Sequence, residues 1–464
     1  MSIETDIPTR PDLDPEAKFK LRDFQEEDVV SMYHRTGFLL ANDMGTGKTV
    51  TALAEIARRY EDRDTMRVLI VTLKSAISVW EYHTPYFLDL PVYTREVPKK
   101  VANWVTVTNW DQLRVNPDYK KVVWTYVIAD EAQNAKNRNA KRTRALWTVP
   151  TMYRRALTGT PIVNRPDDLW AILRWLYPER YRSYWQFFNT YVDFETNPFH
   201  GYREIKGAKN VKKLQKEIGE FTVRRLKKDV LKELPDKYYE RIEVDLNPTQ
   251  RRVYNQMKQD ALAWIGEHED KPLPAKMVVA KLVRLRQITG ATPIDAYQEY
   301  DKNKDTMVWK VTMGEPSAKL DALMDILQST DQQVVVFTNF RSAVRLASAR
   351  MTKAGITHVT LTGTTPDKER TKAIDDFQNG RARVFIGTVK AGGAGITLHA
   401  ASTVVFLDRS WSPADNVQAE DRLHRIGQKN AVQVIHIEAR NTVDQLVEAK
   451  LVWKWSFIKQ ILGG

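Results

Sequence analysis

A glycine-rich segment between two regular elements constrains the fold of this chain more than any other feature. Residues 42–49 read N-D-M-G-T-G-K-T. The apolar run Gly37 to Ala41 precedes them, and a helical pattern from Thr49 to Tyr60 follows. A strand, a glycine-rich loop and a helix in this order form a phosphate-binding unit. The segment therefore predicts an α/β fold that holds phosphate groups where a helix begins.

Each residue type in this loop has a physical reason to be there. The glycines let backbone N–H groups close around phosphate oxygens, Lys48 can reach the β- and γ-phosphates, and the Thr49 hydroxyl can bind Mg²⁺. Asn42 stands where the strict pattern has its first glycine, so the match is imperfect. The residues expected to hold a nucleotide are Gly45, Thr46, Gly47, Lys48 and Thr49.

Short apolar runs separated by helical patterns occur in both halves of the chain. They lie at 67–72, 104–107, 126–129, 333–337, 384–387 and 403–407. Buried strands that alternate with helices indicate parallel, doubly wound sheets. A chain of 464 residues exceeds the usual size of one hydrophobic core, so we expect two domains or more. The middle, from about Pro178 to Gln287, is polar and mostly helical in pattern.

The charge balance favours a polyanionic partner. Lys and Arg number 71 against 58 Asp and Glu, a formal net charge of +13. Nucleic acid is the simplest such partner, although many basic proteins bind none. The chain has no cysteine, which excludes disulfides and thiolate metal sites. No signal-peptide pattern begins the chain and no apolar run is long enough to span a membrane, so we expect a soluble, cytoplasmic protein.

Basic residues gather in three clusters. Their members are Lys136, Arg138, Lys141, Arg142, Arg144, Arg154 and Arg155; then Arg224, Arg225, Lys227 and Lys228; then Lys276, Lys281, Arg284 and Arg286. Charge runs are most often solvated faces. In a chain that also carries a nucleotide loop, the three clusters favour surfaces that follow the phosphates of a nucleic acid.

Two carboxylates follow the apolar run that ends at Ala129. Ligands of open α/β sheets bind at the carboxyl ends of the strands, which is where Asp130 and Glu131 are expected. Asp130 would hold Mg²⁺ through water, and Glu131 would orient and polarise the attacking water. An acidic strand end also commonly caps the next helix. The phosphate loop earlier in the chain favours the hydrolytic interpretation.

Two arginines near the C-terminus could act on the same nucleotide. Residues 418–428 read Q-A-E-D-R-L-H-R-I-G-Q, and on a helix Arg422 and Arg425 would share a face. Alone, such a pair is most often a solvated basic face. Together with the distant phosphate loop, it predicts arginine fingers directed at the γ-phosphate, at a seam between two lobes.

In their chain order these segments resemble the Swi/Snf-type ATPases of helicase superfamily 2. The resemblance runs from about Leu21 to Gln428. It rests on L-R-D-F-Q at 21–25, D-M-G-T-G-K-T at 43–49, D-E-A-Q at 130–133, L-T-G-T-P at 157–161, R-R-L-K-K-D-V at 224–230, V-F-T-N-F-R-S-A at 336–343, G-T-V-K-A-G-G-A-G-I-T-L at 387–398, R-S-W-S-P at 409–413 and the 418–428 segment. The R-R-L-K-K-D-V segment and the W-S-P turn separate this family from ordinary unwinding helicases. With no histone-reading module in sight, the chain looks like the compact bacterial and phage members.

The resemblance implies two RecA-like lobes with inserted helical protrusions, and ATP-driven movement along duplex DNA. Carried over by position, Gln25, Lys48 and Thr49 would bind ATP and Mg²⁺. Gly395 would touch the nucleotide from the second lobe. The remaining residues implied for hydrolysis are Asp130, Glu131, Arg422 and Arg425. Gln133 stands where many members have histidine, which bears on how hydrolysis couples to motion.

The resemblance also implies contacts to the nucleic-acid backbone. The matching positions are Lys74, Thr108, Asn339, Thr362, Thr388, Lys390 and Trp411. Lys390 stands where many members have arginine, so its role is less secure.

The expected organisation places a loose tail at 1–18 and a first lobe at 19–235, with a helical insertion at about 179–222. A helical protrusion and linker would occupy 236–300, and the second lobe 301–441. A C-terminal helix at 442–464 would pack back on the lobes of a motor expected to be monomeric.

Three functions remain open at this stage. The first is a DNA-stimulated ATPase that translocates on duplex DNA and remodels DNA or protein–DNA complexes in replication, recombination or repair. The second is a strand-separating helicase on DNA or RNA. The third is a nucleotide-gated clamp that binds DNA without turnover, which Lys48, Glu131, Arg422 and Arg425 argue against. Phosphate-tracking residues do not distinguish DNA from RNA.

Overall fold

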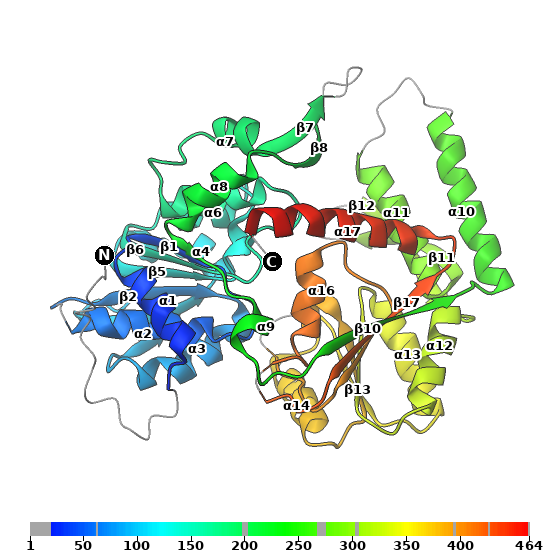
Figure 1. The fold of residues 1–464 in the computed structure, drawn as a ribbon. Helices are drawn as coiled ribbons and strands as arrows, with labels where there is room; N and C mark the ends of the chain where they lie inside the picture. Colours follow the sequence, from blue (N-terminus) through cyan, green and yellow to red (C-terminus); the bar gives the residue numbers. More distant parts are fainter. Residues whose placement is uncertain are drawn as a thin grey trace. The chain divides into compact units, whose positions relative to one another are not determined.

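The computed structural model describes residues 20–61, 64–196, 203–266, 275–301, 306–392, 396–425 and 427–462. The chain folds into two compact units, whose residues can be located in Figure 1 by the colours along the sequence. Unit 1 consists of Met1–Lys232 and Lys454–Gly464, and unit 2 of Glu233–Trp453. The tail expected at 1–18 and Gly395 lie outside the described residues.

Unit 1 is built on a seven-stranded sheet in which all paired strands are parallel. In spatial order the strands are β3 (Val92–Thr94), β4 (Trp104–Asn109), β2 (Arg67–Thr72), β5 (Trp124–Asp130), β6 (Thr151–Leu157), β1 (Gly37–Leu40) and β9 (Thr222–Val223). Helices and short 3₁₀ turns connect them: α1 (Asp23–Tyr33), α2 (Lys48–Tyr60), η1 (Lys74–Ala76), α3 (Ile77–His83), η2 (Thr84–Tyr86), α4 (Trp110–Val115), η3 (Pro117–Lys120), η4 (Ala132–Ala135), α5 (Lys141–Trp147) and α6 (Asp168–Leu176).

The central strands are buried because helices cover both faces of a parallel sheet. Every residue of β1 and β4 is buried, and so is β5 up to its last residue, Asp130. Asp130, at the strand end, is therefore more accessible than the rest of β5.

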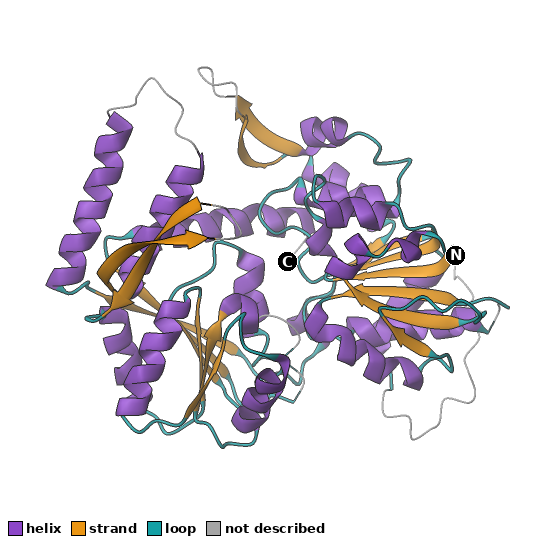
Figure 2. Ribbon diagram, turned by 180° about the vertical axis from the view of Figure 1, so that it is seen from behind, coloured by secondary structure: helices purple, strands orange, loops and turns teal. Residues whose placement is uncertain are grey.

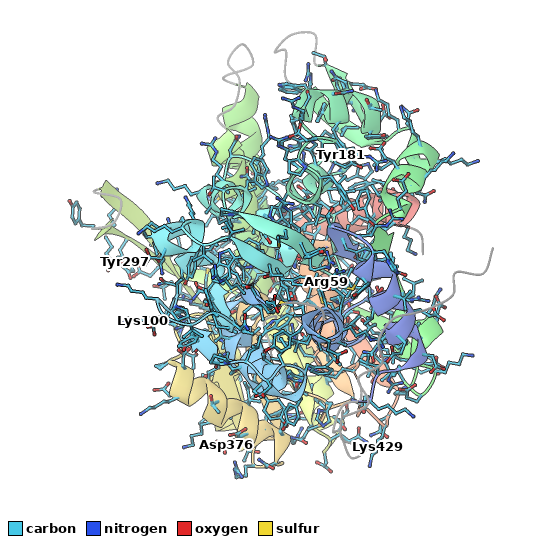
Figure 3. All side chains as sticks on the ribbon, turned by 90° about the vertical axis from the view of Figure 1, so that its left-hand side faces the viewer. Arg59, Lys100, Tyr181, Tyr297, Asp376 and Lys429 are labelled. Atoms are coloured by element: carbon cyan, nitrogen blue, oxygen red, sulfur yellow. The ribbon has the colours of Figure 1, made fainter. Side chains whose placement is uncertain are left out.

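A fully buried ion pair joins α2 to the sheet of unit 1. Glu55 on α2 and Arg155 on β6 are completely buried, with Arg155 Nη2 2.8 Å from Glu55 Oε1. The Tyr126 hydroxyl donates to the same Glu55 oxygen at 2.6 Å. Figure 3 marks the nearby Arg59 among the packed side chains of unit 1, where its guanidinium donates to Tyr126 and lies over the ring of Tyr153.

Unit 1 also carries an extension that is not purely helical. It contains α7 (Tyr184–Tyr191), an antiparallel hairpin of β7 (Val192–Thr196) and β8 (Arg203–Ala208), α8 (Val211–Gly219) and α9 (Lys227–Val230). The helical insertion expected at 179–222 therefore contains a hairpin. Tyr181, at its start, is buried.

Unit 2 has a six-stranded sheet in which all paired strands are parallel (Figure 2). In spatial order these are β10 (Lys237–Val244), β17 (Val432–Ala439), β16 (Thr403–Phe406), β13 (Val334–Thr338), β15 (Val384–Thr388) and β14 (His358–Leu361). The other elements are α10 (Pro248–Gly266), α11 (Ala275–Gly290), the hairpin β11 (Thr292–Asp301) and β12 (Thr306–Gly314), α12 (Ala318–Gln328), α13 (Arg341–Lys353), α14 (Asp367–Gln378), α15 (Val389–Gly392) and α16 (Pro413–Glu420).

The fold class expected from the sequence is confirmed: two α/β lobes, each with a parallel sheet. One expected segment is wrong in kind. The protrusion expected at 236–300 begins with β10, which pairs along its whole length with β17 and belongs to the second sheet. The same region ends in β11 rather than in a helix.

The last helix, α17 (Val443–Leu462), begins in unit 2 and ends in unit 1. In its unit 1 portion, the Lys454 ammonium donates to the side-chain oxygen of Asn164 at 2.8 Å, and the Gln215 amide donates to the Gln460 carbonyl at 2.7 Å. No helix in the described part of the chain is long and apolar enough to span a membrane.

Candidate nucleotide site and strand-end residues

The glycine-rich loop connects β1 to α2 at the carboxyl edge of the sheet of unit 1. Gly45 and Gly47 have φ angles of +80° and +83°, in the left-handed region that glycine adopts without strain. Space also requires glycine at position 47, since a Cβ there would lie 2.4 Å from Gln25 Nε2. Gly47 precedes the first turn of α2, whose free N–H groups suit an anion.

The Lys48 ammonium is held by the loop itself. Its Nζ donates to the carbonyl oxygens of Asn42 at 2.8 Å and Asp43 at 2.9 Å. Burial lowers the pKa of Lys48, while the charges of Glu131 and Asp130 act in the opposite direction. Lys48, Asp130 and Glu131, far apart in sequence, therefore lie close enough to interact electrostatically.

Gln25, expected to bind ATP, contacts the loop in this structure. Its Nε2 donates to the Thr46 carbonyl at 3.0 Å, and its Oε1 accepts from the Arg22 N–H at 2.9 Å. The Thr46 hydroxyl in turn donates to the Asp43 carbonyl at 2.9 Å. The Gln25 side chain thus links the start of α1 to the loop by a hydrogen bond.

Asp130 ends β5, where the sequence predicts a Mg²⁺-binding carboxylate. Its Oδ2 accepts from the Thr72 hydroxyl at 2.7 Å and from Trp80 Nε1 at 3.0 Å. Within the described residues, no arginine or lysine forms an ion pair with it. The carboxylate is oriented by neutral donors and keeps its charge available, which suits a hydrated cation held with the Thr49 hydroxyl.

Glu131 follows in a left-handed conformation, φ +49°, uncommon for a residue with a side chain. Gln133 Nε2 donates to Glu131 Oε2 at 2.6 Å. Backbone strain of this kind persists where the surroundings enforce it, often at functional sites. In the described residues no group of three or more His, Cys, Asp or Glu side chains could hold a metal ion. A metal at Asp130 would therefore also need ligands of other kinds.

In unit 2, five expected nucleic-acid contacts lie at or just after the carboxyl ends of neighbouring strands. Asn339 follows β13, Thr362 follows β14, Thr388 ends β15, Lys390 comes two residues later, and Trp411 follows β16. Strands β16, β13, β15 and β14 are adjacent in the sheet. Because they are parallel, all five residues share one edge of the sheet.

In unit 1, two further contacts were expected. Lys74 is exposed at the end of β2, as a contact would require. Thr108 on β4 is completely buried, and its hydroxyl shares a hydrogen bond of 2.9 Å with the Tyr119 hydroxyl. The Thr108 side chain is thus bonded inside unit 1, and the expected contact of this segment with a nucleic acid stays a prediction.

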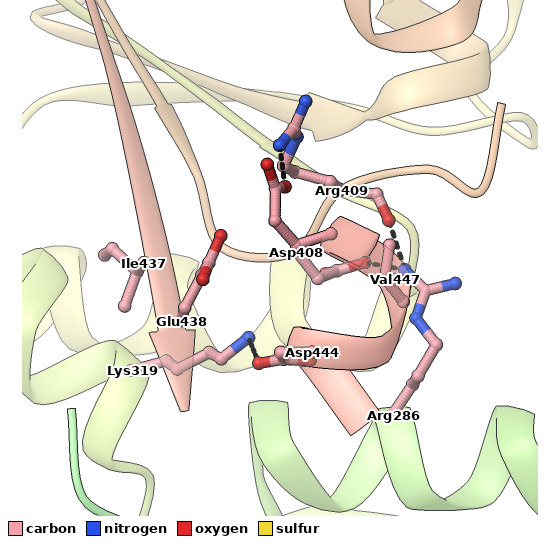
Figure 4. Close-up of a pocket in the computed structure, with 9 residues that line it drawn as sticks. Arg286, Lys319, Asp408, Arg409, Ile437, Glu438, Asp444 and Val447 are labelled. Atoms are coloured by element: carbon pink, nitrogen blue, oxygen red, sulfur yellow. Dashed lines mark hydrogen bonds and ion pairs between the residues drawn. The ribbon is translucent and has the colours of Figure 1, made fainter. Parts of the chain in front are cut away.

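A buried network supports the strand ends of unit 2 (Figure 4). Asp408, just beyond β16, accepts from the Thr338 hydroxyl, from the Asn339 amide and from Arg286 Nη2, the last at 3.1 Å. Lys319 Nζ donates to the Leu407 carbonyl at 2.7 Å and lies 2.6 Å from Asp444 Oδ2. Arg286 also faces the ring of Trp411, 5.6 Å from its centre. The network fixes both Asn339 and Trp411.

Arg422 and Arg425 do not lie on a helix, contrary to the expectation. Helix α16 ends at Glu420, and both arginines lie in the turns that follow. Beyond the helix, the N–H groups of Arg422 and Leu423 donate three residues back, to the carbonyls of Ala419 and Glu420, and the Arg422 carbonyl accepts from the Leu398 N–H at 2.9 Å. Arg422 Nη1 donates to the Ile396 carbonyl at 3.3 Å, and Arg425 Nη1 to the Thr397 hydroxyl at 2.7 Å. Burial lowers the pKa of Arg425.

Several basic residues expected on a nucleic-acid surface pair with buried carboxylates instead. Arg155 pairs with Glu55, Arg286 pairs with Asp408, and the partly exposed Arg225 pairs with Asp28. Each of these carboxylates is buried, and the arginine compensates its charge. Other lysines, such as Lys100 and Lys429, lie at the outer edge of the view in Figure 3. The clusters are therefore only partly surface features.

The partners Asp28, Asp408 and Lys319 were not anticipated from the sequence. Asp28 lies on the buried face of α1, and a charged residue in such a place signals a partner. Which partner it takes cannot be read from spacing, because Arg225 lies 197 residues away.

A glycine-rich loop, a strand-end carboxylate pair and a second parallel sheet define a RecA-like ATPase core. Residues 25–292 match the family model of the SNF2-related domain, and residues 318–427 match the helicase conserved C-terminal domain. The first match covers more than half of the chain. The chain therefore belongs to the SNF2-related family, the ATPases of helicase superfamily 2 identified from the sequence motifs.

The curated relatives described next are much longer than this chain. An uncharacterised ATP-dependent helicase of Mycoplasma pneumoniae is 30% identical over 92% of this chain and 41% of its own length. The chromatin structure-remodeling complex subunit snf21 of Schizosaccharomyces pombe is 27% identical over 94% of this chain and 38% of its own length. The chain thus spans about two fifths of the length of these curated relatives.

Solved structures of the same family are also similar. The Sulfolobus solfataricus SWI2/SNF2 ATPase core in complex with dsDNA is 27% identical, with 96% of this chain and 93% of that chain covered and a TM-score of 0.44. The same core domain alone is 28% identical over 96% of this chain and 91% of that chain, with a TM-score of 0.43.

Proposed function

We propose that this chain hydrolyses ATP when it binds double-stranded DNA and uses the energy to translocate along the duplex. The observation that carries the proposal is that the phosphate loop after β1 and the Asp130–Glu131 pair at the end of β5 lie at the carboxyl edge of one parallel sheet in a SNF2-related chain. Lys48 would bind the β- and γ-phosphates, and Glu131 would orient the attacking water. Thr49 and Asp130 would hold Mg²⁺, which supplies charge stabilisation at the phosphates.

Arg422 and Arg425 complete the proposed machinery. Both belong to unit 2, and both carry a guanidinium group: Arg422 Nη1 donates to the Ile396 carbonyl, and Arg425 Nη1 donates to the Thr397 hydroxyl. We assign them to the developing charge on the γ-phosphate. Removal of an arginine finger typically lowers kcat by about 10³-fold or more, with a much smaller effect on binding.

Duplex DNA is the proposed partner because the chain belongs to the SNF2-related family, and the expected contacts are Lys, Thr, Asn and Trp side chains at strand ends. Such groups suit phosphates and sugars, which carry no sequence information. The net charge of +13 agrees with a polyanion. We further propose that the motor remodels DNA or protein–DNA complexes in replication, recombination or repair, as a monomer in a bacterial or phage-infected cytoplasm.

An ATPase assay tests the proposal directly. ATP turnover would be measured at low salt without nucleic acid, and with duplex DNA, single-stranded DNA or duplex RNA. Duplex DNA should give the largest stimulation, and Lys48→Ala and Glu131→Gln should abolish it. Equal ATPase rates with and without DNA would contradict the proposed coupling of hydrolysis to DNA binding. Unchanged turnover in Glu131→Gln would show that Glu131 takes no part in hydrolysis.

Translocation needs its own measurement, because a strand-separating helicase would also hydrolyse ATP. Displacement of the third strand of a triplex reports movement along an intact duplex. We expect displacement without separation of a plain blunt duplex. Robust ATP-dependent separation of a long duplex would favour the helicase function instead.

A further inference from the structure

The segment that follows β9 runs along the phosphate loop. Strand β9 pairs with β1 at the edge of the sheet of unit 1. The chain continues parallel to the start of the loop: the Asp43 N–H donates to the Arg225 carbonyl at 2.9 Å, and the Lys227 N–H donates to Asp43 Oδ2 at 2.9 Å. Arg224 Nη1 donates to the Ala41 carbonyl at 3.2 Å. Backbone and side chains of this segment thus bind every residue from Ala41 to Asp43.

Asn42 lies at the centre of these contacts. It is 1% exposed, and both ends of its side-chain amide are bonded. Its Oδ1 accepts from the Arg225 N–H at 2.8 Å, and its Nδ2 donates to Asp28 Oδ2 at 2.6 Å. The other oxygen of Asp28 accepts from Arg225 Nε at 2.9 Å. Asn42, Asp28 and Arg225 therefore close a ring of hydrogen bonds from three distant parts of the chain.

The ring of hydrogen bonds includes one of the two residues that bind the Lys48 ammonium. The Lys48 ammonium donates to the carbonyl oxygens of Asn42 and Asp43, the two residues that the ring and the following segment hold. On the other side, Asp28 belongs to α1, which also carries Gln25 and its bond to Thr46. A shift of Asn42 would therefore displace both the lysine anchor and the loop.

We propose that Asn42, Asp28 and Arg225 form a positioning clamp that sets the conformation of the phosphate loop and so the affinity for the nucleotide. None of the three is assigned to touch the nucleotide. The clamp gives the Asn42 side chain a task that the first glycine of the strict loop pattern could not perform. The proposal rests on the nucleotide binding proposed above.

Charge exchange tests the clamp. In Asn42→Asp, a carboxylate replaces the amide 2.6 Å from the buried Asp28 carboxylate, so a hydrogen bond becomes a repulsion between like charges. Adding Asp28→Asn restores one carboxylate and one amide with their positions exchanged, and both Arg225 donors keep an acceptor. We expect Asn42→Asp to weaken ADP binding roughly tenfold or more, and the double variant to recover to within about threefold of the wild type.

Glu27→Gln is the matched control. Glu27 pairs with the same Arg225 guanidinium, Oε2 to Nη2 at 2.8 Å, but its side chain is 65% exposed. An exposed ion pair contributes little, so this variant should bind ADP within about twofold of the wild type. The comparison separates the buried clamp from a general loss of charge near Arg225.

ADP affinity would be measured by titration calorimetry on the full chain, with melting temperature and duplex-DNA affinity recorded for each variant. DNA affinity should not change in the folded variants, which a merely unfolded protein could not achieve. Wild-type ADP affinity in Asn42→Asp would overturn the clamp, and so would a folded double variant as weak as Asn42→Asp. If the double variant does not fold, Asn42→Ala decides, since unchanged ADP affinity there would also overturn it. Failure of the wild type to bind ADP would instead reject the proposed function.

Discussion

Asp130 in unit 1 and Asp408 in unit 2 occupy equivalent places and have different surroundings. Asp130 ends β5, and Asp408 follows β16 by two residues. Each accepts a hydrogen bond from a threonine of a neighbouring strand, Thr72 in one case and Thr338 in the other. Asp408 is also paired with Arg286, whereas Trp80 supplies the second side-chain donor to Asp130.

The difference shows how one position in a parallel sheet serves two purposes. An internal guanidinium neutralises Asp408, which is 6% exposed and holds the Asn339 loop in place. Neutral donors orient Asp130 but leave its charge for a cation from solution. Whether a strand-end carboxylate holds a loop in place or can bind a metal therefore depends on its partner, not on its place in the fold.

The largest expected effect is on hydrolysis. Asp130→Asn should lower kcat for ATP by about 10³-fold, since it removes a metal-binding charge. Asp408→Asn should lower kcat by less than about tenfold in protein that remains folded, because it acts only through the Asn339 and Trp411 loops. Steady-state ATPase assays with saturating duplex DNA measure both. Equal losses in the two variants would break the distinction between ligand and support.

Stability should show the reverse order. Asp408→Asn leaves the Arg286 guanidinium buried without its counter-charge, and removal of one partner of a buried pair typically costs about 3–5 kcal/mol. The side chains of this pair are 6% and 5% exposed. Asp130→Asn should cost far less, because within the described residues no arginine or lysine forms an ion pair with Asp130, whose side-chain donors are Thr72 and Trp80. Urea unfolding gives the free energies, and a larger loss in Asp130→Asn would contradict the comparison.

The same contrast explains what the sequence could predict. Strands β1, β2, β5, β13, β15 and β16 were predicted because buried parallel strands are continuous apolar runs. Strand β10 was missed because it is an edge strand, and its sequence K-Y-Y-E-R-I-E-V is mostly exposed. An edge strand pairs on one side only and need not be apolar.

The candidate site divides along similar lines. The residues of the phosphate loop and the 130–131 carboxylates form local patterns, so their spacing reveals them. The residues that hold them do not: Arg286 and Asp408 are 122 positions apart, and Arg225 resembles any other member of a basic run. Only the fold shows that a charge is compensated internally. The spacing of Arg422 and Arg425 fits a helix, but side-chain spacing alone does not show where a helix ends.

A buried histidine of the second sheet should make the stability of the protein depend on pH. In unit 2 burial, reinforced by the Arg409 charge, lowers the pKa of His436 to about 3. The unfolded chain, with a histidine pKa near 6.5, binds the proton more tightly, so stability is lost as pH falls from about 6.5 toward 3.

The loss should approach about 1.4 kcal/mol per pH unit for this one group. Burial raises the pKa of the neighbouring Glu438, which acts in the opposite direction at lower pH, so the wild-type slope alone is ambiguous. The difference between wild type and His436→Phe, from urea unfolding at pH 7, 6 and 5, isolates the histidine. Parallel pH profiles would show that His436 takes up its proton in the folded state.

The smallest effect concerns the two strand-end lysines. Lys48 is enclosed by the carbonyls of its loop, whereas Lys390 on α15 is exposed at the strand-end edge of unit 2. If Lys390 contacts a DNA phosphate, Lys390→Ala should reduce the slope of log affinity against log salt by about one unit, equally for all sequences. The KM for ATP at saturating DNA should not change, because Lys390 belongs to the DNA-facing edge rather than to the phosphate loop. Binding of two unrelated duplexes across a salt series measures the slope, and a sequence-dependent loss would contradict a backbone contact.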